Sequence, residues 1–286
     1  MAPKTVLITG CGPDSIGSAF AKRFQLRGLR VFATGRTDKD TDLDPALAPL
    51  GIETFTLDVT SESSIADAVV KVQELTKEGG KASLDILINC AGVVQAMPFA
   101  DSQLATVKQL MDVNVIGTWA TSHAFLPLLL DSSHGSVIVG MGSVNEVLCP
   151  PFFAAYNASK SAVEAMMRTI RRELAPLGVR VILLKSGSVR SALFSNAVAS
   201  EGLPDGSLYG AEVDRYIRLQ EFKKGAAFME ADAYAEKAVN EILKEKPRAV
   251  AWFGGLVWMS WLLSWLGWET MLVSFCEDVN DRWTKI

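Results

Sequence analysis

Cysteine, histidine and clustered positive charge are all scarce in this chain, and each shortage excludes a class of protein. The 286 residues include four cysteines, which are far apart and form no Cys-x-x-Cys pair, so we expect free thiols in a reducing compartment. The two histidines have no partner at ligand spacing, and we therefore expect no metal site. Lysine and arginine are scattered and the formal net charge is -4, so the chain lacks the basic surface of a nucleic-acid-binding protein.

A long apolar segment is missing from the start of the chain. The apolar stretch in the first ten residues is too short for a signal peptide, so we expect a cytoplasmic protein. The composition, 49% hydrophobic and 21% charged, is typical of a globular chain. At this length one large domain or two small ones could form.

Short apolar runs alternate with helical patterns along most of the chain. A run at 6–8 stops at a turn-rich segment, a helical pattern covers 15–26, and a second strand follows at 30–34. This is the βαβ unit that builds a parallel sheet. The pattern predicts further strands at 53–57, 86–89, 136–139, 179–184 and 249–253, and helices at 63–78, 102–111, 113–130 and 154–177. We therefore predict one α/β domain over 1–286, a doubly wound Rossmann-type parallel sheet with helices on both faces.

Gly10 and Gly17 flank the turn between the first predicted strand and the first predicted helix. In this context the pair predicts a phosphate-binding loop, because amide groups at the start of a helix attract phosphate; a plain tight turn is the alternative. Ser15 stands where a middle glycine is usual and could donate to a phosphate through its hydroxyl. We expect Ile16 to be a cofactor-binding residue as well. Asp14 would repel a pyrophosphate, and we interpret it as a helix N-cap or Asx-turn residue.

The second predicted strand is followed by Arg36, with no acidic residue before Asp38. An acid at this point would hold the ribose 2′-hydroxyl of NAD, whereas an arginine suits the 2′-phosphate of NADP. A solvated surface charge is the alternative for Arg36. We predict 2′-phosphate binding, so that the cofactor is NADPH.

Two other predicted strands end in residues suited to a ligand. Asp58 and Val59 follow one strand, and Asp58 could accept from an adenine amino group. Asn89, Ala91 and Gly92 lie at the end of another, where small residues let the backbone approach a ligand. In an open α/β sheet both points lie at the carboxyl ends of strands, where ligands bind.

Tyr156 and Lys160 are four residues apart in a predicted helix, with Ser143 thirteen residues upstream of the tyrosine. Positions i and i+4 share a helix face. A phenol titrates near ~10, too high for proton transfer near neutrality, and a neighbouring cation favours the phenolate. The spacing alone is weak evidence, because many helices contain such a pair by chance.

In order along the chain, these residues resemble the short-chain dehydrogenase/reductase superfamily, over roughly 4–195 and beyond. The resemblance depends on Thr9-Gly10, Ile16-Gly17, Asp58-Val59, Asn89-Cys90-Ala91-Gly92, Asn114, Ser143, Tyr156 and Lys160. The long loop and the tryptophan-rich tail look like the fungal branch near 1-acyl-dihydroxyacetone-phosphate reductases, or like reductases of secondary metabolism.

The resemblance implies a role for each member of the set. Tyr156 would protonate the alkoxide formed when a ketone is reduced. Lys160 would lower the pKa of Tyr156 and hold the nicotinamide ribose. Ser143 would bind the substrate carbonyl oxygen, and Asn114 would hold a water in line with Lys160.

The chain departs from the family pattern in two places. Ser186-Gly187 replaces a common Pro-Gly, and Val189 and Ser191 then occupy the positions expected to meet the nicotinamide carboxamide. Gly142 precedes Ser143 where a second serine is common, and we expect little effect from that.

Residues 190–228 lie between the sixth strand and the next helix and could form a lid over the nicotinamide. They are rich in apolar side chains, which favours a bulky hydrophobic carbonyl substrate; ordinary packing is the alternative. The apolar residues considered are Met97, Phe99, Val147, Phe152, Phe153, Leu193, Phe194, Leu203, Tyr209, Tyr216 and Phe222.

The segment 249–268 has no charged residue, and six of the seven tryptophans lie beyond residue 250. Residues 254–286 form an extension whose uncharged helical part, 256–268, is too short to span a membrane. Trp258, Trp261, Trp265 and Trp268 share one helix face. This stripe predicts burial in the core or in a homodimer or homotetramer interface; peripheral membrane contact is the alternative.

The combined prediction is an NADPH-dependent ketoreductase acting on a bulky hydrophobic ketone or aldehyde. The rival is a non-redox use of the fold, as an isomerase, cyclase or cofactor-binding scaffold. A non-redox descendant has less need of a tuned tyrosine–lysine pair, so the intact set favours the reductase.

Overall fold

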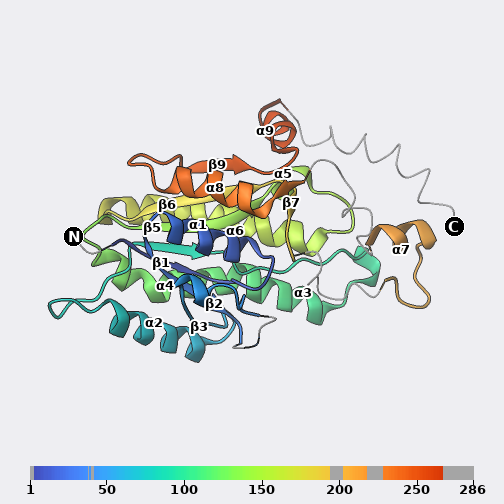
Figure 1. Cartoon of the computed structure of the whole chain (residues 1–286). Coiled ribbons are helices and arrows are strands. Elements are labelled where there is room, and N and C mark those ends of the chain that lie inside the picture. The colour runs from blue at the N-terminus through green and yellow to red at the C-terminus, as the bar shows by residue number, and fades with distance from the viewer. Residues whose placement is uncertain (1–2, 38, 40–41, 194–201, 218–227, 267–286) are drawn as a thin grey trace.

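The computed structural model describes residues 3–37, 39, 42–193, 202–217 and 228–266 of the chain. Phe194, Phe222 and Trp268 therefore lie outside the described residues. Figure 1 shows a central sheet between two layers of helices. This arrangement confirms the predicted fold class.

The central sheet has seven parallel strands in the order β3-β2-β1-β4-β5-β6-β9. The order reverses at β1, so a crevice opens at the carboxyl ends of β1 and β4. The central strands β1, β4, β5 and β6 are largely apolar and buried, as expected of strands covered on both faces. Their bounds are β1 Thr5–Ile8, β2 Arg30–Gly35, β3 Glu53–Thr56, β4 Ile86–Asn89, β5 Val137–Ser143, β6 Arg180–Ser186 and β9 Val250–Phe253, with the short pair β7 Val189–Arg190 and β8 Met229–Glu230 outside this sheet.

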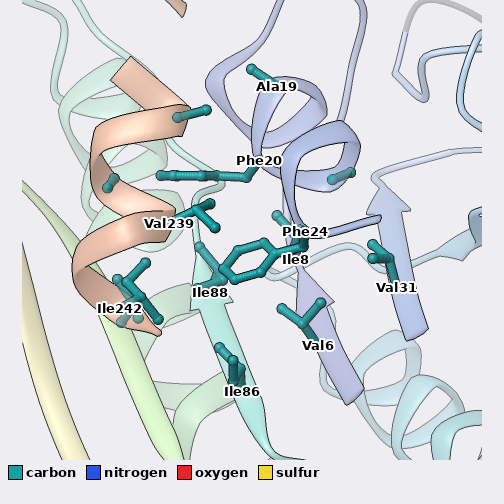
Figure 2. Packing of buried hydrophobic residues seen from close by; sticks show 14 of the residues in the cluster. Val6, Ile8, Ala19, Phe20, Phe24, Val31, Ile86, Ile88, Val239 and Ile242 are labelled. Carbon is teal, nitrogen blue, oxygen red and sulfur yellow. The ribbon is translucent and has the colours of Figure 1, made fainter. Parts of the chain in front are cut away.

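Helices cover both faces of the sheet. The helices are α1 Ile16–Leu26, α2 Glu62–Thr76, α3 Leu104–Met111, α4 Gly117–Leu130, α5 Asn145–Leu148, α6 Ala154–Leu174, α7 Ala211–Ile217, α8 Ala231–Ile242 and α9 Val257–Leu266. Figure 2 shows α1 and α8 packed together over β1 and β4, where Phe20 and Phe24 meet Val239 and Ile242. The opposite face buries side chains of α2, α4 and α6. The core on both faces fixes the strand ends where the candidate site lies.

The run Leu104–Leu130 is long and apolar enough to cross a membrane by length and composition. It joins α3 to α4 through a π-helical turn, Asp112–Ile116. Phe125 and Leu128 are buried against the sheet, so we interpret the run as a core helix.

Helix α9 lies beside β9 and α5 (Figure 1). Its three tryptophans are exposed. The exposed fractions are 67% for Trp258, 46% for Trp261 and 75% for Trp265. Burial of this stripe in the core of the chain is therefore wrong for these three residues. An interface between copies and contact with a membrane surface stay predictions for the stripe.

Asp85 ties the amino-terminal edge of the sheet together. Its Oδ2 accepts from the backbone amide of Thr5 at 2.7 Å, and its Oδ1 accepts from Ser132 Oγ at 2.6 Å and pairs with His134 Nδ1 at 3.1 Å. Burial alone would raise the pKa of Asp85, but the hydrogen bonds from Ser132, Thr5 and His134 hold it below its ordinary value.

Asp85→Asn should lower the free energy of unfolding by about 2 kcal/mol, because an amide nitrogen would face donors that the carboxylate now satisfies. A carboxyl group whose pKa is lowered in the folded state stabilises the fold at pH values above its pKa in the unfolded chain. The difference in unfolding free energy between the native protein and the variant should therefore become smaller as the pH falls below about 4. Urea unfolding at several pH values measures it, with the exposed Asp131→Asn as control. A loss independent of pH would contradict an electrostatic role.

Candidate active site

Tyr156 and Lys160 lie on the inner face of α6, near its start, and both are buried. Lys160 Nζ donates to the carbonyl oxygen of Met141 at 2.9 Å and lies 5.7 Å from the centroid of the Tyr156 ring. Met141 belongs to β5, so the pair points toward the carboxyl end of the central strands. The predicted shared helix face is confirmed by this geometry.

Ser143 is the last residue of β5 and is buried next to Tyr156. Its hydroxyl accepts from the backbone amide of Asn145 at 3.1 Å and is hydrogen-bonded to the Tyr156 side chain. Two hydroxyl groups therefore lie together at the strand end. A carbonyl oxygen placed there could accept from both.

Burial dominates the pKa of Tyr156 in this structure. Burial raises it to about 12; the hydrogen bond with Ser143 opposes this rise, and Glu146 adds to it. Burial lowers the pKa of Lys160, and Glu146 opposes that shift. Lys160 donates to a backbone carbonyl and lies over the Tyr156 ring. The lowering of the Tyr156 pKa by Lys160 together with an oxidised nicotinamide stays a prediction.

Asn114 lies in the π-helical turn between α3 and α4, a feature often found at functional sites. Its Nδ2 donates to the carbonyl of Val93 at 2.9 Å and to Ser159 Oγ at 3.0 Å, and its Oδ1 accepts from the amide of Val93 at 2.8 Å. A Cβ built on Gly92 would lie 3.3 Å from Asn114 Oδ1 and 3.8 Å from Lys160 Nζ. Asn114 thus braces the segment beside Lys160, while its role in holding a water stays a prediction.

A cavity of about 520 Å³ opens at the carboxyl ends of the strands, next to the Tyr156–Lys160 pair. It lies in the crevice where the strand order reverses. Most of the residues predicted to bind a dinucleotide line it. These are Gly10, Ser15, Ile16, Gly17, Arg36, Val59, Ala91, Gly92, Tyr156, Lys160 and Ser191.

Three predicted cofactor residues do not line this cavity. Asp58 Oδ1 accepts from Thr60, through its amide at 2.9 Å and its hydroxyl at 2.7 Å, as in an Asx turn. Asn89 donates to Ser122 Oγ at 2.9 Å, and its buried Oδ1 has no hydrogen-bond partner among the described residues. Val189 is buried in the core cluster that includes Tyr234, so its side chain does not face the cavity.

Other lining residues were not predicted to bind the cofactor, although Leu193 was predicted for the substrate end and Cys90 belongs to the family motif. Gly12, Pro13, Asp42, Leu57, Cys90, Val93, Val113, Met141, Gly142, Ser186, Ala192 and Leu193 complete the wall. Most of them adjoin predicted residues in sequence, so widening each motif by one or two positions would have found them. Asp42 had no such signal.

The glycine loop has the close approaches expected of a nucleotide cradle. A Cβ on Gly17 would lie 2.4 Å from the carbonyl oxygen of Gly10, and Gly10 itself has a φ of +74°. Ser15 is the N-cap of α1, and its hydroxyl accepts from the amide of Ser18 at 2.9 Å. Asp14 is therefore not the N-cap, contrary to one expectation; it has a φ of 53°, and its carbonyl accepts from Ala192 at 3.0 Å.

Arg36 reaches the cavity wall with 66% of its side chain exposed. Its Nη2 lies 3.2 Å from Asp42 Oδ1, and Thr37 Oγ1 donates to Asp42 Oδ2 at 2.8 Å. The arginine predicted to bind a 2′-phosphate is thus already paired with a carboxylate on the same wall.

The sequence matches a known family over most of its length. A family model described as short chain dehydrogenase matches residues 4–202. The chain belongs to the short-chain dehydrogenase family. A short-chain dehydrogenase of Aspergillus ruber is 34% identical over 271 residues, which cover 95% of this chain and 91% of its relative.

Two further comparisons place this short-chain dehydrogenase among its relatives. An NADPH-dependent 1-acyldihydroxyacetone phosphate reductase of Schizosaccharomyces pombe is 34% identical over 238 residues, covering 79% of this chain and 77% of the yeast protein. A short-chain dehydrogenase from Streptomyces avermitilis superposes with a TM-score of 0.73 at 24% identity, covering 99% of this chain and 95% of the other. The first likeness supports the fungal branch, and the second supports the fold.

The residues present fit a nicotinamide dinucleotide. The close Gly10–Gly17 approach leaves no room for a side chain at either glycine, so a phosphate could come close to the backbone at the start of α1, where Ser15 adds a hydroxyl. Arg36 lies at one part of the cavity wall, and Tyr156 and Lys160 lie at another. The phosphates would lie on the loop, and the nicotinamide would lie beside the tyrosine.

Proposed function

We propose that this oxidoreductase reduces a ketone or aldehyde on a bulky hydrophobic substrate to an alcohol, using NADPH. The observation that most favours this reaction is the buried Tyr156 hydroxyl, hydrogen-bonded to Ser143 at the cavity that would hold a dinucleotide. Monitoring NADPH absorbance with a panel of carbonyl compounds tests it. No oxidation of NADPH with any of them would favour the non-redox alternative.

Each residue has a defined task in this reaction. A bound NADPH would supply the hydride for the carbonyl carbon. Ser143 and Tyr156 bind the carbonyl oxygen, and Tyr156 transfers its phenolic proton to that oxygen as negative charge develops there. The Lys160 ammonium lies close enough to the Tyr156 ring to offset the phenolate charge that follows.

The choice of NADPH has two supports and one opposing feature. Arg36 lines the cavity, and the yeast relative is named as NADPH-dependent. Asp42 lines the same wall, and its carboxylate would repel a 2′-phosphate while occupying Arg36. We propose that the 2′-phosphate displaces Asp42 from Arg36, because a phosphate offers more acceptor oxygens and charge than a carboxylate.

The apolar substrate proposal depends on the wall beside Tyr156. Met97 and Phe153 are buried with Tyr156 in one cluster, so they support this wall rather than form an open surface. The rings of Phe152 and Tyr209 meet edge to face with centroids 5.7 Å apart. Leu193, from the predicted lid segment, lines the cavity directly. A carbonyl panel graded by chain length should therefore show kcat/KM rising with apolar size.

We further propose that the exposed α9 stripe binds a second copy of the chain in a homodimer or homotetramer. Replacing Trp258 and Trp265 together with serine should lower the oligomer mass in sedimentation without unfolding the chain, because both side chains are largely exposed. Liposome flotation distinguishes the alternative: loss of flotation with unchanged mass would indicate membrane contact instead. Exposed Trp119→Ser on α4 is the matched control.

A further inference from the structure

A buried group of charges lies beside the catalytic residues and has no task in the reaction above. Lys185 Nζ of β6 lies 2.9 Å from Glu146 Oε1 of α5 and 2.9 Å from Glu164 Oε1 of α6. The side chains of Lys185 and Glu146 are 7% and 0% exposed, and Nζ lies 4.8 Å from the centroid of the Trp252 ring. Burying an ion pair costs more desolvation than a hydrophobic pair of the same size, so stability alone is a weak reason for the group.

Gly142 makes room for this group. It pairs with Lys185 across β5 and β6, and a Cβ at Gly142 would lie 3.2 Å from Glu146 Oε2 and 3.3 Å from Oε1. A serine at Gly142 would press against the carboxylate. The glycine therefore leaves space for the Glu146 carboxylate, and the expectation that it has little effect on the reaction stays a prediction.

The group is joined to the catalytic residues on two sides. Tyr156, Lys160 and Glu164 follow one another at four-residue intervals along α6, so Glu164 lies on the same face of the helix. Helix α5 begins two residues after Ser143, and the Asn145 amide donates to the Ser143 hydroxyl. Glu146 is thus held between the residue that would bind the carbonyl oxygen and the helix that bears the proton donor.

We propose that Glu146 is a positioning residue whose buried charge controls how readily the Tyr156–Lys160 pair releases its proton. This inference depends on the proposed reductase function for its biological use. The physical effect does not require turnover, because it concerns the proton affinity of Tyr156.

The electrostatics of the surrounding groups support this role. Burial raises the pKa of Glu146 to about 7 against the pull of Lys185, so its charge changes near neutrality. When ionised, Glu146 raises the pKa of Tyr156 and of Lys160. The other charged or titratable groups facing it from the packed elements are Lys185 and Glu164; the described part of α9 has no charged residue.

The sign of the effect follows from this arrangement. Ionised Glu146 disfavours the Tyr156 phenolate, so removing its charge should move the Tyr156 titration to lower pH. Glu146→Gln changes the formal charge of the group from -1 to 0 when all three members are ionised. Combining Glu146→Gln with Lys185→Met restores the formal charge of the group to -1. The double variant therefore distinguishes an effect of charge from an effect of altered packing.

The test is the ultraviolet absorbance of tyrosinate during pH titration of the full chain with saturating NADP⁺, using the Tyr156→Phe form of each variant as blank. Glu146→Gln should shift the Tyr156 titration toward acid by on the order of one pH unit. In the double variant Glu146→Gln with Lys185→Met, the Tyr156 titration should return most of the way to its pH in the native protein. Glu173→Gln, on the exposed far end of α6, should not shift it.

An unshifted titration in Glu146→Gln, or the same shift in the single and double variants, would overturn the proposal. If Glu146→Gln does not fold, Glu164→Gln keeps the Glu146–Lys185 pair and should shift the titration in the same direction; no shift there would overturn it too. A shift without NADPH oxidation on any carbonyl compound would refute the reductase function and leave this inference standing. NADPH oxidation without a shift of the Tyr156 titration would refute this inference and leave the reductase function standing.

Discussion

Tyr156→Phe should reduce kcat for carbonyl reduction by about a thousandfold and leave NADPH affinity within about twofold. The phenol oxygen is hydrogen-bonded to Ser143 and is placed to give its proton to the substrate oxygen. The ring packs in a cluster with Val94 and Phe153, and phenylalanine preserves those contacts. Steady-state kinetics and NADPH fluorescence titration measure the two quantities separately.

The matched control is Tyr234→Phe, which also removes a buried phenol oxygen. Tyr234 Oη and Ser186 Oγ lie 2.6 Å apart on the face covered by α1 and α8. Loss of the Tyr234 hydroxyl should lower the free energy of unfolding by about 1 kcal/mol and change kcat by less than about threefold. If Tyr156→Phe retains more than about a tenth of the native kcat, another group delivers the proton and the mechanism is wrong.

The parts of the site that depend on local sequence were predictable. The shared face of Tyr156 and Lys160 follows from a four-residue spacing in a helix, and the Gly10–Gly17 cradle follows from a glycine pair between a strand and a helix. Strand ends gather at one edge of a parallel sheet, so Ala91 and Gly92 reach the same cavity. In each case the deciding contacts lie within one motif or follow directly from the sheet order.

The parts that depend on distant contacts were not predictable. Asp42 reaches Arg36 only because its segment folds back over Gly35, where a Cβ would lie 2.3 Å from the Asp42 carbonyl oxygen. Glu146 and Lys185 meet through the β5–β6 pairing and have no shared motif. Burial raises the pKa of Tyr156, and the four-residue spacing of Tyr156 and Lys160 cannot reveal burial.

Arg36→Ala should weaken NADPH binding by about 30-fold while changing NADH binding by less than about twofold. A charge-assisted contact with a phosphate contributes about 2 kcal/mol to binding. NADH has no 2′-phosphate, so it makes no such contact and its affinity should not depend on the arginine. An acid placed at Gly35 is a poorer test, because any side chain there would collide with the backbone of Asp42. Fluorescence titration with each dinucleotide gives both dissociation constants.

Asp42→Asn provides the opposite arm of this test. It removes the carboxylate that pairs with Arg36 and faces the same cavity, so NADPH should bind several-fold more tightly and NADH about as before. Lys39→Ala removes a nearby positive charge that does not line the cavity, and should discriminate little between the dinucleotides. Equal losses of NADPH and NADH in Arg36→Ala would mean that the arginine supports the loop rather than the 2′-phosphate. Tighter NADPH binding in Asp42→Asn together with a selective loss in Arg36→Ala would instead show that the two residues set cofactor choice by competing for one guanidinium.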